Sequence, residues 1–118
     1  MRHQNKKYKI GTNPAHRKAL LKNLACEVID HGKIKTTFVK CKAVQSTVEK
    51  LVTLAKEDSV ANRRLAYSKL NNKDVVKKLF DEVGPKFKSR NGGYTRIVKV
   101  ADARFNDGAK MGYIAFVE

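Results

Sequence analysis

The chain lacks several residue types, and each shortage excludes a class of protein. Its 118 residues include no tryptophan, two prolines and two cysteines. Cys26 and Cys41 form no Cys-x-x-Cys pair, so we expect two reduced thiols rather than a disulfide framework. The longest stretches without a charged residue are 10–16 and 111–117, far shorter than the roughly 18 residues that a membrane span requires. We therefore expect no membrane helix and no membrane partner.

The beginning of the chain is basic, but no apolar segment follows it. Residues 1–7 resemble the first segment of a signal peptide, yet the apolar run of about 7 to 15 residues that should come next is missing. This pattern favours a cytoplasmic protein. Since 42% of the residues are hydrophobic, we expect one domain with one core over residues 1–118.

Acidic residues are scarce, and the excess of basic residues is unevenly placed. Asp and Glu total 11 against 26 Lys and Arg, which gives a net charge of +15. Three windows, residues 1–26, 31–48 and 83–101, contain no acid and hold 16 of the 26 bases. Because a protein that is basic only for solubility would mix the two signs, this segregation predicts one extended anion-binding face. Chance clustering on a merely basic surface is the alternative.

Enzyme motifs are also missing. The chain has no phosphate-binding Gly-x-x-x-x-Gly-Lys, no dinucleotide-binding Gly-x-Gly-x-x-Gly, no Gly-x-Ser-x-Gly and no His-Glu-x-x-His. Its three histidines and two cysteines show no short spacing of the kind that zinc sites use. The sequence therefore predicts no enzyme, no cofactor, no metal ion and no small-molecule substrate.

Apolar residues recur at helical spacing in four segments, which are residues 14–31, 38–56, 60–70 and 74–83. Asn13 is expected to cap the first helix, whose first position is Pro14. Gly84-Pro85 is a strong stop signal, so the fourth helix should end before it.

Three shorter segments alternate and are rich in β-branched residues, which are residues 33–37, 94–100 and 111–117. Turn chemistry at 106–108 predicts that the last two pair as an antiparallel hairpin. The order is then α-β-α-α-α-β-β. We expect an α+β two-layer domain with a small mixed three-stranded sheet. One face of the sheet packs on the helices, and the other face is open to a ligand.

Two segments have features typical of nucleic-acid binding. Residues 89–96 combine adjacent glycines for a close backbone approach to phosphate, forked donors, and an aromatic face for a base or ribose, namely Gly92, Gly93, Arg90, Arg96 and Tyr94. A plain glycine turn into a strand is the alternative. Residues 1–12 read as an extended basic arm that becomes ordered on nucleic acid, or as a tail without a partner.

Five strings resemble a known family, and they are Met1-Arg2-His3, His16-Arg17-Lys18-Ala19, Ile34-Lys35-Thr36-Thr37, residues 59–66 and residues 92–97. In order and spacing, over nearly all of the chain, they are similar to the bacterial large-subunit ribosomal protein seventeen family. The resemblance implies a structural protein of the large ribosomal subunit that binds large-subunit ribosomal RNA and has no enzymatic activity. It also implies a place on the outer side of the particle towards the tunnel exit, next to large-subunit protein thirty-two.

The chain departs from this family in two places. Lys6-Lys7-Tyr8-Lys9 stands where family members often have several arginines, which puts bidentate contacts there in doubt. The loop at 103–108 lacks the Arg-Arg-Gly-Asp string common in the family, so Arg104 is its one candidate contact.

The windows, the motifs and the resemblance together give the candidate RNA-binding residues. They are Arg2, His3, Lys6, Lys7, Lys9, His16, Arg17, Lys18, Lys22, Lys33, Lys35, Lys40, Lys42, Arg63, Arg64, Lys86, Lys88, Arg90, Gly92, Gly93, Tyr94, Arg96, Lys99 and Arg104. For the arginine pair at 63–64, the alternative is that both side chains only cover the surface of their helix.

Three other classes of function compete with this interpretation. A small RNA-processing enzyme would share the basic face but needs a cluster of titratable groups in a pocket. A DNA-compacting protein would be expected to dimerise and to carry minor-groove arms or wedges. A cationic membrane-active protein would place its bases on a helix with a strong apolar face.

Overall fold

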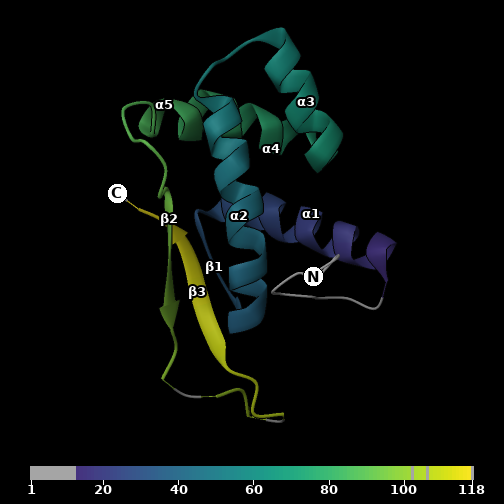
Figure 1. The fold of residues 1–118 in the computed structure, drawn as a ribbon, viewed down its shortest axis with the longest axis vertical. Helices are drawn as coiled ribbons and strands as arrows, with labels where there is room; N and C mark the ends of the chain where they lie inside the picture. The colour runs from purple at the N-terminus through teal and green to yellow at the C-terminus, as the bar shows by residue number, and fades with distance from the viewer. Residues whose placement is uncertain (1–12, 102, 106, 118) are drawn as a thin grey trace, which may run out of the picture.

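The computed structural model describes residues 13–101, 103–105 and 107–117, so the predicted arm at 1–12 lies outside the described residues. Helices cover one face of a three-stranded sheet (Figure 1). The element order α-β-α-α-α-β-β and the α+β fold class are confirmed.

Helix α1, Pro14–His31, begins and ends where its caps predict. The Asn13 side chain accepts a hydrogen bond from the backbone N–H of His16, at 2.8 Å. At the other end Gly32 has a φ of 77°, and its N–H donates to the carbonyl of Val28. The chain then enters strand β1, Lys33–Thr37.

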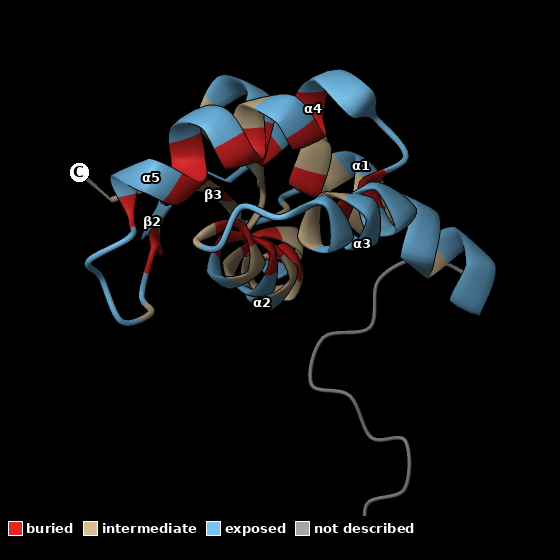
Figure 2. Cartoon of the chain, turned by 90° about the horizontal axis from the view of Figure 1, so that it is seen from above, coloured by how far each residue is buried: buried red, intermediate tan, exposed pale blue. Residues whose placement is uncertain are grey.

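Helix α2, Phe38–Ala55, is the central element of the fold. Thr37 caps it by accepting from the N–H of Lys40, at 3.4 Å. Its buried side chains contact both the sheet and the other helices, and they are Cys41, Val44, Val48, Leu51, Val52 and Ala55. In Figure 2 α2 is seen end-on below α4 and α5, with α3 beside it, and its buried positions lie towards these helices.

Helix α3, Val60–Leu70, is capped by Ser59, and Asn71 ends it in the left-handed conformation with a φ of 52°. Asn72 then caps helix α4, Lys73–Lys78, by accepting from two backbone N–H groups. Two adjacent asparagines thus end one helix and begin the next.

The predicted stop at Gly84-Pro85 is wrong. Helix α4 continues through a π-helical turn, η1 at Leu79–Val83, into the short helix α5 at Gly84–Lys86. The N–H of Gly84 donates to the carbonyl of Leu79, five residues back, and this wider turn lets Pro85 enter a helix although it has no N–H to donate. Gly84 has an ordinary helical φ of −56°, and a Cβ on it would overlap the carbonyl oxygen of Ala55. Close packing on α2, rather than helix termination, therefore requires this glycine.

The predicted hairpin is confirmed by β2, Thr95–Lys99, and β3, Met111–Phe116. The strand order is β1-β3-β2, and β3 runs antiparallel to both neighbours. The sheet is therefore not mixed as expected, because the returning strand of the hairpin lies in the middle and separates the two strands that run in the same direction.

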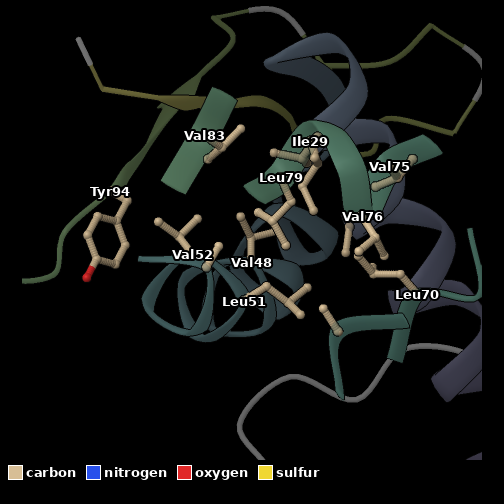
Figure 3. Close-up of a cluster of buried hydrophobic side chains, with 14 of the residues drawn as sticks. Ile29, Val48, Leu51, Val52, Leu70, Val75, Val76, Leu79, Val83 and Tyr94 are labelled. Carbon is tan, nitrogen blue, oxygen red and sulfur yellow. The ribbon is translucent and has the colours of Figure 1, made fainter. Parts of the chain in front are cut away.

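The core lies between α2, the α4–η1 segment and the inner face of the sheet. In Figure 3, Leu79 and Val83 of η1 face Val48 and Val52 of α2. The ring of Tyr94 lies at the edge of this cluster.

Candidate nucleic-acid interface

The outer face of the sheet, the face turned away from α2, carries three cations. Register places Lys35, Tyr113 and Val98 in one line across the three strands, and Lys33, Ala115 and Arg96 in the next line. The two lysines and Arg96 are exposed, and Val98 is 52% exposed. We define these six residues, together with Met111, as the outer face. No acidic residue occurs at its described positions.

The inner face, which is turned towards α2, is apolar at the centre of the sheet. Ile34, Ile114 and Ile97 stand opposite one another, and Ile114 is completely buried. Next to them, Gly112 lies against α2, where the thiol of Cys41 donates to its carbonyl at 3.5 Å. The outer face is thus the side that the fold leaves for a partner.

The N-terminal half of α1 is a second basic region. The buried residues of α1, Ala25, Val28 and Ile29, all lie in its C-terminal half. The N-terminal half, which we call the projecting half, extends away from α2 (Figure 1). That half carries the candidate residues His16, Arg17, Lys18 and Lys22.

A third group of cations surrounds an aromatic ring where α2 begins. The ammonium groups of Lys42 and Lys99 lie 5.3 and 4.9 Å from the centre of the Phe38 ring. Lys40 follows on the same helix and is partly exposed. Elements far apart in sequence therefore bring cations from two acid-free windows together.

Lys86 at the end of α5 is exposed, as are Lys88 and Arg90 in the segment that follows. Gly92 and Gly93 follow with φ values of 85° and 63°, which an L side chain rarely adopts. They make the turn into β2, and the backbone approach to phosphate stays a prediction.

The expectation that Tyr94 stacks on a base is wrong. Its side chain is only 2% exposed, and its ring packs against Phe87 with centroids 5.5 Å apart. Its hydroxyl lies 3.1 Å from the hydroxyl of Thr53, and the ammonium of Lys56 lies 4.9 Å from its ring centre. The Lys56 ammonium, and after it the Thr53 hydroxyl, lower the pKa of the phenol. Tyr94 is a core residue, and Arg96 does not share its face.

Two candidate arginines are held by carboxylates of the protein. Arg63 donates to Asp58 at 2.7 and 2.8 Å and to Asp81 at 2.9 Å, and so links the α2–α3 loop to η1. Hydrogen bonds from Arg63 lower the pKa of Asp58. Arg104 donates to Asp107 through Nε at 2.9 Å and lowers the pKa of that carboxyl.

Both arginines thus already pair with carboxylates of the protein, so an RNA contact by either stays a prediction and would compete with these pairs. Arg64, the neighbour of Arg63 on α3, is exposed and stays a candidate. Arg2, His3, Lys6, Lys7 and Lys9 lie outside the described residues.

Sequence reasoning missed Tyr113. It lies at the centre of the outer face, where the ammonium groups of Lys33 and Lys35 are 5.3 and 5.9 Å from its ring centre. The alternation of 111–117 was a usable signal, because it places Tyr113 on the face opposite to that of Ile114.

Within the part of the chain that the structure describes, no group of three or more His, Cys, Asp or Glu is placed to hold a metal ion. Both cysteines are free thiols, and burial raises the pKa of each. None of the described helices is long and apolar enough to cross a membrane.

Three groups of described cations thus lie on the outer face, on the N-terminal half of α1 and beside Phe38. A comparison with known protein families matches residues 20–117 to ribosomal protein L17. This match covers α1 from residue 20, the other helices and the whole sheet, while His16, Arg17 and Lys18 precede it. The chain therefore belongs to the ribosomal protein L17 family and is a structural component of the large ribosomal subunit.

Proposed function

We propose that the chain binds large-subunit ribosomal RNA mainly through phosphate contacts from the outer face, the projecting half of α1 and the cations beside Phe38. The observation that carries the proposal is the contrast between paired and unpaired cations. Arg63 and Arg104 lie against carboxylates, whereas Lys33, Lys35 and Arg96 stand on a face without a described acid.

The physical reason is electrostatic. Cations crowded on one face repel each other, and a polyanion relieves this repulsion while its condensed counterions are released. RNA supplies such a regular array of phosphates. The unpaired cations therefore favour an RNA-bound protein.

Several finer expectations belong to this proposal. The arm at 1–12 would add further phosphate contacts, and the protein would act in the cytoplasm as part of the ribosome without catalysis. Large-subunit protein thirty-two is kept as an expected neighbour on the resemblance alone.

Co-sedimentation with large ribosomal subunits in high salt tests the proposal. A variant with Lys33→Ala, Lys35→Ala and Arg96→Ala should travel with the subunits less than the parent does.

The matched control removes three exposed lysines outside the acid-free windows, through Lys50→Ala, Lys73→Ala and Lys77→Ala. Net charge falls equally in both variants, so general attraction is equal. The proposal fails if the two variants leave the subunits at the same salt concentration.

A further inference from the structure

The ring of Tyr113 has a position that suits recognition of an unpaired base. It stands in the middle strand of the sheet, opposite Lys35 of β1 and Val98 of β2. Tyr113 is partly exposed, and Val98 beside it is 52% exposed although it is apolar. The centre of the outer face is therefore an aromatic and aliphatic surface that water covers in the free protein.

The charges around this ring define its partner. Lys33 and Lys35 hold their ammonium groups 5.3 and 5.9 Å from the ring centre, and no described carboxylate pairs with either of them. Arg96 stands in the neighbouring line across the sheet. A ligand on this face thus meets a ring with two ammonium groups over it and a guanidinium in the next line, so a base that stacks on the ring takes the place of an ammonium group.

A nucleotide matches both parts of this surface. Its base has a flat face that stacks on an aromatic ring, and its phosphates lie within a few ångströms of that base. A base inside a duplex is already stacked on its neighbours and cannot reach the ring, so the match is to a single-stranded segment. An acidic peptide would meet the lysines but has no comparable use for the ring.

We propose that the outer face binds an unpaired RNA nucleotide, whose base stacks on Tyr113 while Lys33, Lys35 and Arg96 contact the adjoining phosphates. This inference rests on the proposed RNA-binding function and deepens it. It assigns base stacking to Tyr113, the role that the sequence pattern had assigned to Tyr94.

The test compares two labelled RNA probes, a single-stranded octamer of adenosine and a 12-base-pair duplex, binding to the full-length protein. Tyr113→Leu should weaken binding of the octamer about 5- to 150-fold, because a stacked base is lost. Binding of the duplex, which uses phosphate contacts only, should change less than about twofold. Tyr113→Phe keeps the ring and should restore octamer binding.

Tyr67→Leu is the matched control, since Tyr67 is also partly exposed, at 42%, but lies on α3. It should bind both probes as the parent does. A second measurement needs no variant: adding the octamer to the parent protein should shift the ring proton resonances of Tyr113 upfield.

Three results with the RNA probes would overturn the inference. They are unchanged octamer binding by Tyr113→Leu, equal losses for octamer and duplex, and Tyr113 ring resonances that do not move when octamer binds. A decaglutamate peptide serves as a further probe. The inference would also be overturned if this peptide competes with the octamer and Tyr113→Leu weakens binding of the peptide more than binding of the RNA, because the face would then dock an acidic protein. The proposed function fails separately, if the parent protein does not travel with large subunits in high salt.

Discussion

Two adjacent lines of residues cross the sheet, and the fold treats them in opposite ways. Ile34, Ile114 and Ile97 form the inner line, in which Ile114 is completely buried against the helices. Lys35, Tyr113 and Val98 form the outer line and face solvent. On each strand, the residue of one line is the sequence neighbour of the residue of the other line. Because successive side chains of a strand point to opposite faces, the two lines lie on opposite faces of the sheet. Which face is covered is decided by the helices, since α2 packs on all three strands and α1 packs on β1.

A second contrast concerns charge. Arg63 has an ion pair to each of two aspartates and joins elements of the fold, while Arg96 on the outer face has no ion pair to a described carboxylate. A cation of the first kind contributes to the structure of the protein. A cation of the second kind is available to an RNA phosphate.

The largest expected effect comes from the inner line. Ile114→Ala should lower the free energy of unfolding by about 2 to 5 kcal/mol, because it leaves a cavity in a site that is fully buried. Urea denaturation measures this change. Val98→Ala, which truncates the outer line, should cost less than about 1 kcal/mol. Equal costs for the two variants would remove the distinction between the faces.

The next effect separates the two tyrosines. Tyr94→Leu should lower the free energy of unfolding by about 2 kcal/mol, through loss of the ring contact with Phe87 and the hydrogen bond to Thr53. Affinity for large-subunit RNA should not change. Tyr94→Phe keeps the ring and should cost about 1 kcal/mol. If Tyr94→Leu weakens RNA binding without lowering stability, our placement of Tyr94 in the core is wrong.

A smaller effect is expected at Arg96. Arg96→Ala should weaken binding to a large-subunit RNA transcript and reduce the slope of log K against log salt by about one unit, since one phosphate contact is lost. Its stability should stay within about 0.5 kcal/mol of the parent, because the side chain is exposed. Lys50→Ala on the exposed side of α2 serves as the control, and an equal loss of affinity there would contradict a specific contact at Arg96.

The smallest effect concerns the paired arginine. The Arg63 guanidinium lowers the pKa of Asp58 in the folded protein, so the pair stabilises the fold above the unfolded pKa of about 4 and is lost as the pH falls through the lower, folded value. Asp58→Asn should therefore melt at a lower temperature than the parent at pH 7. This difference should shrink below about pH 4. A difference that stays constant down to pH 2.5 would show that the charge on Asp58 does not matter.

Much of the fold could be predicted because its signals are local. Asn13 caps the helix beside it as predicted, and Ser59 and Gly32 likewise act on the helix next to them. The alternation in 111–117 likewise predicted a strand. Such features depend on a few neighbouring residues, which a single sequence contains.

The errors came from contacts between distant residues. Gly84 has the sequence of a stop, but its role depends on the carbonyl of Ala55 in another helix. Tyr94 was grouped with the glycines and arginines of residues 89–96 as an aromatic face for a base, whereas its position is decided by Phe87 and by Thr53 on α2. The ion pair between Arg63 and Asp81 likewise forms only because α3 and η1 lie side by side in the fold.

The central claim is that cations of the acid-free windows bind RNA phosphates, and the salt dependence of binding tests it most directly. The measurement is the affinity of the full-length protein for a large-subunit ribosomal RNA transcript over a range of salt concentrations. If about half of the 16 bases in the three windows contact phosphates, the slope of log K against log salt should be about −5 to −8. A slope of about −1 to −2 would contradict the account, because it would leave most of these cations without a phosphate partner.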